Sequence, residues 1–157
     1  MNLSARTSST VLSILFLCLF IGFHATSVAQ DMEVKDDRQL IIEAMEDYVL
    51  ALYNVEPERI ARSVDTTLHK VGYYDYKEKS YYNKVMTYQQ LYDLSARWNK
   101  TGESANENSP KMIDIYEIHD KTAAAKLTAE WGIDFMHLYK INGRWMIKNI
   151  MWQGPPK

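Results

Sequence analysis

A single carboxylate lies within an apolar and aromatic stretch near the end of the chain. Between Trp131 and Gln153, Asp134 is the only acidic residue. On the apolar side of a strand a carboxyl group is desolvated, which favours its neutral form and can prepare it to act as a general acid or base. The same residue could instead be a hydrogen-bonded structural group at the rim of a packed sheet. We predict Asp134 as the candidate catalytic residue, with the structural role as the alternative.

Four further side chains are candidates for binding a ligand. Tyr48 belongs to an amphipathic segment, and Met136 and Asn149 share a sheet face with Asp134 if the C-terminal hairpin is regular. Diagonal neighbours on a sheet lie about 7–8 Å apart, so Asp134 and Asn149 could contact one ligand, or each other. His69 begins a predicted strand and could reach the pocket mouth, where an unperturbed histidine titrates near neutral pH. Each has a structural alternative, because large aromatics fill cores as readily as pockets and a lone histidine is often structural.

The sequence lacks several patterns that accompany common kinds of site. No two histidines stand at metal-ligand spacing, and neither a Gly-rich phosphate loop nor a Gly-x-Ser-x-Gly elbow occurs. The mildly negative charge balance also opposes a nucleic-acid partner, which requires a clustered basic face. We therefore expect no metal, no cofactor and no nucleic acid, and an unknown small molecule as the ligand.

The first 29 residues are predicted to be a secretory signal peptide. An apolar run covers residues 11–23, and a small-x-small pattern ends at Ala29, which places cleavage before Gln30. The run is short for a membrane-spanning helix of about 20 residues, so an uncleaved anchor is the less favoured alternative. Cleavage would leave residues 30–157 as one domain, periplasmic or secreted, with no cysteine and no membrane attachment.

The first half of the remaining chain has helical periodicity. In residues 36–54, apolar side chains recur at helical spacing and form one buried face. Pro57 suits the first turn of a short second helix, and Thr87 with Gln90 forms a capping box that opens a third. The pattern predicts three helices, each with one buried side.

The second half is predicted to be mainly strands. Six strands are expected, over residues 66–74, 81–86, 111–119, 122–130, 133–141 and 144–152. The Asn-Gly pair at 142–143 is a strong signal for a two-residue hairpin. A regular ladder from that hairpin pairs Met136 with Asn149. It also pairs Asp134 with Met151, and it turns both pairs toward the helices.

The opposite face of the predicted sheet carries mixed polar and aromatic side chains. The same register places Phe135, His137, Tyr139 and Ile150 there. A face of this kind is either solvated or covered by another subunit. We predict a homodimer through this outer face.

The order of elements and the C-terminal residues resemble the nuclear-transport-factor-2-like superfamily. Residues 109–153, with Asp134-Phe135 on one strand and Gly143-Arg144-Trp145-Met146-Ile147 on the next, are similar to the terminal pattern of its bacterial exported members, labelled "putative lumazine-binding" or SnoaL-like. The resemblance implies an α+β, cystatin-like cone. In such a cone a curved, mixed but mainly antiparallel sheet wraps around three helices from the N-terminal half and leaves a pocket at its open end. The fold serves binding proteins and enzymes alike, so it does not decide the function.

Three functions remain open from the sequence. The first, which we predict, is an exported protein that binds a small molecule in the cone, with Tyr48, His69, Met136 and Asn149 as ligand-binding residues. The second, allowed by the resemblance, is a cofactor-free isomerase, cyclase or dehydratase that uses Asp134 as the acid or base, assisted by Tyr48 or His69. The third is a dimeric interaction module built on the outer face.

Overall fold

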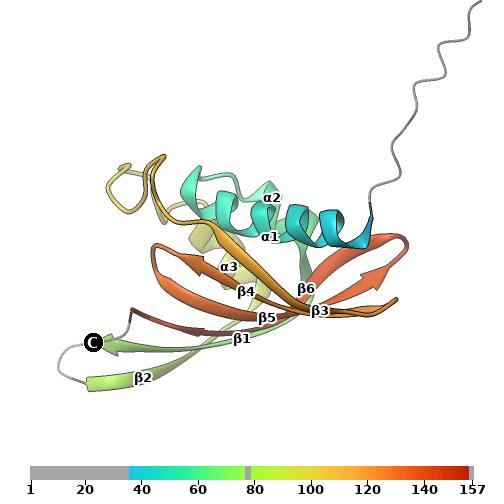
Figure 1. Cartoon of the computed structure of the whole chain (residues 1–157). Coiled ribbons are helices and arrows are strands. Elements are labelled where there is room, and N and C mark those ends of the chain that lie inside the picture. Colours follow the sequence, from blue (N-terminus) through green and yellow to red (C-terminus); the bar gives the residue numbers. More distant parts are fainter. Residues whose placement is uncertain (1–35, 77–78, 156–157) are drawn as a thin grey trace, which may run out of the picture. The chain divides into compact units, whose positions relative to one another are not determined.

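The computed structural model describes residues 36–76 and 79–155, which belong to one compact unit (Figure 1). The predicted signal peptide, 1–29, lies outside the described residues. Along this part of the chain the elements run α1, α2, β1, β2, α3 and then β3 to β6. No helix within it has both the length and the apolar composition needed to cross a membrane.

The three helices of the described part lie over one face of the sheet (Figure 1). α1 (Asp37–Tyr53) begins where the Asp36 side chain accepts the backbone N–H of Gln39. α2 (Glu58–Ser63) is short, and α3 (Tyr88–Ser95) opens with the predicted capping box. The buried side of α1 is the predicted apolar stripe, with Ile41, Met45, Tyr48, Val49 and Leu52 among its residues.

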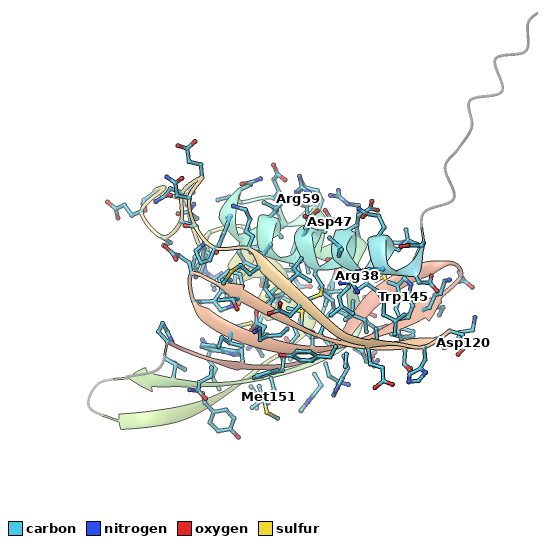
Figure 2. The ribbon with its side chains drawn as sticks, viewed as in Figure 1. Arg38, Asp47, Arg59, Asp120, Trp145 and Met151 are labelled. Carbon is cyan, nitrogen blue, oxygen red and sulfur yellow. The ribbon has the colours of Figure 1, made fainter. Side chains whose placement is uncertain are left out.

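Ion pairs join the first two helices on their solvent side. Asp47 on α1 binds Arg59 on α2 at 2.7 Å (Figure 2). Arg62 binds the same carboxylate at 2.9 Å. The two helices therefore hold each other in place above the sheet.

Six strands of the described part form one mixed sheet in the order β2-β1-β6-β5-β4-β3. They are β1 (Val64–Tyr76), β2 (Lys79–Met86), β3 (Met112–Ile118), β4 (Thr122–Ala129), β5 (Gly132–Ile141) and β6 (Arg144–Gln153). β1 and β6 run parallel, and every other neighbouring pair is antiparallel. The sheet curves without closing (Figure 1), which confirms the predicted α+β class and the mainly antiparallel sheet.

The core lies between the helices and the sheet face that is turned toward them, the inner face. Buried residues of this face include Ala125, Leu127, Ala129, Met136, Leu138, Trp145 and Ile147. Their alternation along β4 and β5 follows the predicted pattern, because successive side chains of a strand point to opposite faces.

One extra residue changes the register of the last hairpin. Leu138 pairs with Ile147, as a regular ladder from the turn requires. His137 then pairs with Asn149, so Lys148 is the extra residue of a β-bulge. Beyond a bulge, the residues of the bulged strand change faces relative to a regular ladder.

The bulge overturns part of the predicted register. Met136 pairs with Ile150, and Asp134 pairs with Trp152. The predicted partners of these two residues are therefore wrong. Ile150, predicted on the outer face, is 1% exposed and belongs to the core, whereas Met151 projects from the side of the sheet away from the helices (Figure 2).

Candidate functional site

Asp134 lies in a buried polar cluster with Lys70, Tyr48 and Trp131. Its Oδ2 accepts a hydrogen bond from the indole N–H of Trp131 at 2.9 Å, and its Oδ1 is 3.5 Å from the ammonium nitrogen of Lys70. Lys70 donates a hydrogen bond to the Tyr48 hydroxyl at 2.5 Å. Asp134 and Tyr48 have no exposed surface, and Lys70 is 5% exposed. A charged pair is thus removed from water, an arrangement that is tolerated only while both partners remain in place.

The strands bring Lys70 and Asp134 together across β6. Lys70 on β1 pairs with Ile150 of β6, and Asp134 on β5 pairs with Trp152 of the same strand. The two charged side chains therefore leave the inner face on either side of β6. Tyr48 reaches them from the buried side of α1. The cluster depends on the bulge, because the bulge sets which residues of β6 lie between its members.

Gly72 provides the space in which the Trp152 indole lies against β1. The two residues are partners in the β1–β6 pairing, and a Cβ atom at position 72 would lie 1.7 Å from Trp152 Nε1. The indole also stacks on Tyr74, with ring centroids 5.4 Å apart and an angle of 20° between the planes. A side chain at position 72 would therefore force the indole to move.

A cavity of about 80 Å³ adjoins the cluster between α1, α3 and the inner face. Its described lining combines one charged side chain, Lys70, with Tyr48, Leu52, Met86, Leu91, Leu94, Trp98, Trp131 and Trp152. The Trp131 ring makes edge contacts with Tyr48 and Trp98, at centroid distances of 5.9 and 5.4 Å. Such edge-to-face contacts are favourable and hold the aromatic walls in place. We refer to this space as the inner cavity.

Burial perturbs the two titratable partners of Asp134 in opposite directions. Desolvation raises the pKa of Tyr48 well above its ordinary value of 10.0, and the neighbouring Asp134 charge adds to the effect. Desolvation lowers the pKa of Lys70 from its ordinary value of 10.5, although the Asp134 charge opposes the change. Tyr48 therefore keeps its proton at neutral pH, and Lys70 releases its proton more readily than a solvated lysine does.

Two buried polar atoms at the site lack a hydrogen-bond partner among the described residues, Asp134 Oδ1 and Trp152 Nε1. Asp134 Oδ1 has the Lys70 charge nearby, at 3.5 Å. The Trp152 N–H belongs to a residue that lines the inner cavity. A buried donor that is left unpaired costs about 1–3 kcal/mol, so an acceptor atom placed beside it would be stabilised.

The structure brings only some of the predicted site residues together. Asp134 and Tyr48 lie in the same cluster, whereas Met136 is buried on the inner face but does not line the inner cavity. His69 and Asn149 are neighbours in the β1–β6 pairing and lie on the outer face. The bulge in β6 turns Asn149 to this face, whereas His69 faces outward because it precedes the inward-facing Lys70 on β1. The sheet separates them from Asp134, so the predicted Asp134–Asn149 pocket is not formed. Their part in ligand binding stays a prediction.

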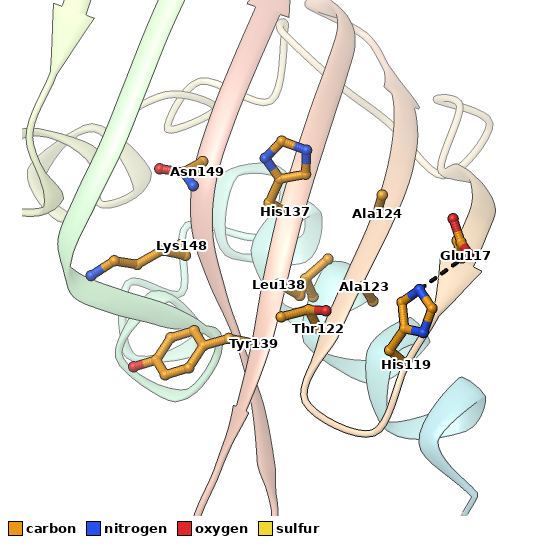
Figure 3. A pocket seen from close by; sticks show the side chains of 10 residues that line it. All are labelled: Glu117, His119, Thr122, Ala123, Ala124, His137, Leu138, Tyr139, Lys148 and Asn149. Atoms are coloured by element: carbon orange, nitrogen blue, oxygen red, sulfur yellow. Dashed lines mark ion pairs between the residues drawn. The ribbon is translucent and has the colours of Figure 1, made fainter.

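The outer face has an open hollow of about 350 Å³ (Figure 3). Asn149 and His137 lie side by side within it, on β6 and β5. Glu117 and His119 form an ion pair of 3.1 Å on its other side, where both side chains are exposed. Water screens charges in such an open site, so the hollow offers weaker electrostatic recognition than the inner cavity.

Lys70 is the site residue that the sequence reasoning missed. Alternation along the predicted strand 66–74 places Leu68, Lys70 and Gly72 on one face. A lysine between an apolar residue and a glycine on a face that packs against helices is unusual, because a buried charge requires a partner. The position of Lys70 on the helix-facing side is therefore the sequence feature that indicates a buried charge. The partner, Asp134, could not be recognised without the order of the strands.

The inner cluster can perform hydrogen bonding and proton exchange. Lys70, Tyr48 and Asp134 are within reach of one another, so a proton could pass among them or to a bound molecule. Within residues 36–76 and 79–155, no three His, Cys, Asp or Glu side chains are grouped so that they could hold a metal ion.

Comparisons with known proteins agree on the fold. Residues 36–153 match the protein family described as "Putative lumazine-binding". Similar solved structures include NTF2-like proteins of unknown function from Shewanella baltica OS155 (16% identity, TM-score 0.58), Silicibacter pomeroyi DSS-3 (15%, 0.55) and Methylobacillus flagellatus KT (22%, 0.54). In the same order, the alignments cover 76, 73 and 79% of this chain and 94, 92 and 97% of the other chain. A comparison with curated proteins found no match.

Proposed function

The chain belongs to the "Putative lumazine-binding" family of the nuclear-transport-factor-2-like superfamily, and we propose that it binds a small molecule in the inner cavity. The observation that carries the proposal is an aromatic-lined cavity with a buried ammonium group and an unpartnered indole N–H. Ligand sites typically place a few polar groups among apolar walls. Here the aromatic rings would supply contact area, and Lys70 and Trp152 would orient the ligand.

The charges around the cavity favour a neutral ligand with a hydrogen-bond acceptor. Lys70 and Asp134 compensate each other, so an anionic ligand would add an uncompensated charge to a desolvated site. An ammonium group has three donors, and Lys70 directs one to Tyr48. A carbonyl oxygen or a ring nitrogen could accept from Lys70 and from Trp152 Nε1 together. We therefore propose a neutral molecule with such an acceptor as the ligand class.

The volume of the cavity limits the size of this ligand. Benzene binds in an engineered apolar cavity of about 150 Å³ in another protein, and drug-sized ligands need about 300–1,000 Å³. The inner cavity, at about 80 Å³, suits a molecule of a few heavy atoms. A bicyclic compound such as the lumazine in the family name would enter only after an aromatic wall residue moved.

Binding can be tested with defined probes. The full chain is titrated with acetamide, a neutral amide of four heavy atoms, and separately with lumazine, while tryptophan fluorescence is recorded. We expect saturable binding of acetamide. Trp152→Phe keeps a ring but loses the N–H, and it should bind about 2- to 10-fold more weakly, at about 0.5–1.5 kcal/mol per hydrogen bond. Trp145→Phe, at a tryptophan that does not line the inner cavity, is the matched control and should bind normally. Binding that is equal in both variants, or absent for both probes, would refute the proposal.

One observation supports the alternative function, a cofactor-free enzyme that uses Asp134 as the acid or base. Asp134, Lys70 and Tyr48 form a chain of groups that could exchange protons, as an isomerase, cyclase or dehydratase requires. Asp134 faces Lys70 and Trp131, so a proton would reach a ligand through Lys70 or Tyr48. Turnover that survives Asp134→Asn in a folded protein would remove Asp134 as the acid or base.

Export is proposed from the N-terminal sequence. The apolar run at residues 11–23 and the small residues up to Ala29 are the supporting features. Mass spectrometry of the protein from cells that express the full chain should give an N-terminus at Gln30 in the periplasmic or culture fraction. A cell-associated protein that retains residues 1–29 would contradict export.

A homodimer through the outer face is a second proposal. Val85, Met151 and Phe135 are 62, 56 and 49% exposed, and the strand pairing places them in one row with Val71. Exposed apolar patches of this kind commonly mark contact surfaces. Next to Phe135 in this row is Lys126, which forms an ion pair with Asp114 at 2.7 Å. In a twofold dimer, Lys126 of each copy could pair with Asp114 of the other copy.

Light scattering at several concentrations tests the dimer. Phe135→Asp should convert it to a monomer, whereas Ile141→Asp, at an exposed residue of the hairpin end, should not. A wild-type protein that is monomeric at every concentration would refute the dimer.

A further inference from the structure

Two groups of an aspartate, a lysine and a tryptophan lie in different surroundings within the described part of the chain. In the inner cluster, Asp134 receives the Trp131 N–H and pairs with Lys70. In the other, Asp37 receives the Trp145 N–H at 3.0 Å and pairs with Lys140 at 2.6 Å. The Lys140 side chain is 24% exposed and that of Lys70 is 6% exposed. Of these two lysines, only Lys70 lines the inner cavity.

We propose that the amino group of Lys70 forms an imine with a small aldehyde or ketone held in the inner cavity. The inference rests on the proposed binding cavity and adds a covalent bond to it. A lysine becomes a nucleophile toward carbonyl carbon when it is desolvated and faces the substrate, because only the neutral amine reacts. Lys70 meets both conditions, since it is buried and is one of the residues that line the inner cavity.

The neighbours of Lys70 can take up and return its proton. The titratable groups that face it are Asp134 from β5 and Tyr48 from α1. Lys70 could pass its ammonium proton to the Asp134 carboxylate, whose Oδ1 is 3.5 Å away and has no hydrogen-bond donor among the described residues. Burial lowers the pKa of Lys70 despite the opposite charge beside it, which is consistent with this transfer.

The reaction balances without any further reagent. The amine lone pair attacks the carbonyl carbon, a C–N bond forms, and the C=O π electrons move to oxygen, which takes a proton. The carbinolamine then loses its hydroxyl group and the remaining N–H proton as one water molecule, and the C=N bond forms. In sum, a carbonyl compound and the Lys70 amine give an imine and water. Tyr48 and Asp134 are positioned to supply and accept the protons in these steps.

The size and lining of the cavity select the carbonyl compound. A volume of about 80 Å³ admits a chain of a few carbon atoms. The aldehyde or ketone oxygen would meet the unpartnered Trp152 N–H before it leaves as water. The expected class is a short aliphatic aldehyde or ketone without charge.

The test uses reductive trapping on the full chain. The protein is incubated near pH 7 with a low concentration of propanal and sodium cyanoborohydride, which reduces an imine to a stable propyl amine. Peptide mapping by mass spectrometry then compares Lys70 with Lys140 in the same molecules. We expect labelling of Lys70 to exceed that of Lys140 by about tenfold or more, because only Lys70 of the two lines the cavity that would hold the aldehyde beside the amine. Labelling of Lys140 with little or none at Lys70 would overturn the inference.

Matched variants locate the reaction. Lys70→Met should lose the preferred adduct, whereas Lys140→Met should keep it. If Lys70→Met does not fold, the ratio of Lys70 labelling to Lys140 labelling in the wild-type protein still tests the imine. Saturable binding of acetamide without a Lys70 adduct would refute the imine and leave the proposed binding intact. Absence of both would refute both.

Discussion

Lys70 of β1 and Asp134 of β5 meet across the strand that lies between them, with Nζ and Oδ1 3.5 Å apart. β6 separates their backbones, and the Trp152 indole of β6 lies against Gly72 of β1 rather than between the two charges. Each charge is therefore the main electrostatic partner of the other in a desolvated site. The stability of the fold and the chemistry of the inner cavity depend on the same pair.

Removal of one member of the pair should destabilise the fold strongly. Lys70→Met leaves Asp134 buried without its cation, and breaking a buried pair in this way costs about 3–5 kcal/mol. Lys140→Met is the matched control, and it should lower stability much less, because the Lys140–Asp37 pair is partly exposed and screened. Urea denaturation of both variants measures the difference. Equal losses would show that burial of Lys70 has no special energetic role.

Removal of both charges should restore much of that loss. In Lys70→Met with Asp134→Leu, no unpaired charge remains, and apolar replacement of a buried pair is often close to neutral. The double variant should therefore be more stable than either single variant in the same denaturation experiment. A strictly additive loss would mean that the two residues act independently. The double variant should also lose the reactive lysine and the imine.

Tyr48 should contribute to the free energy of unfolding at neutral pH, and this contribution should be lost at alkaline pH. The folded-state pKa of Tyr48 lies well above 10.0, because of burial and the Asp134 charge. Above pH 10 the unfolded chain loses this proton while the folded protein keeps it, so the contribution is complete below pH 10 and falls as the pH rises toward the folded-state pKa. The stability of the wild type minus that of Tyr48→Phe should therefore decrease above pH 10. Tyr116→Phe, at an exposed tyrosine, is the control, and its difference from the wild type should change less with pH.

A methyl group at position 72 should displace the Trp152 indole. The new Cβ of Gly72→Ala would lie 1.7 Å from Nε1, and such overpacking costs about 1–3 kcal/mol. The aromatic circular dichroism of the variant should change, since the indole leaves its stacked position on Tyr74. In a Trp152→Leu background the same substitution should cost less. An unchanged spectrum with unchanged stability would contradict the close packing of Gly72 and Trp152.

The sequence predicted the elements and one half of the site. The capping box, the stripe on α1 and the alternation in β4 and β5 are local patterns, and each was confirmed. The inward position of Asp134 follows from the same alternation, which runs in β5 from Gly132 to Leu138 and is not interrupted by the bulge in the partner strand. Local periodicity therefore sufficed wherever a residue's face depended only on its own strand.

The rest of the site depended on relations between strands. The extra residue Lys148 has no distinctive type, and the Asn-Gly turn gives the register only as far as Leu138. Asn149 was therefore assigned to the wrong face. Lys70 was overlooked because its partner lies on a strand that is far away in sequence and is not its neighbour in the sheet.

We propose that a small neutral acceptor binds beside Lys70 and satisfies the Trp152 N–H. The four tryptophans give four indole N–H signals in a proton–nitrogen NMR spectrum of the labelled protein, each assignable from a Trp→Phe variant. On titration with acetamide, the Trp152 signal should move to higher proton frequency as it gains an acceptor, while the Trp145 signal stays in place. A Trp152 signal that does not move at saturating acetamide would contradict the proposed binding.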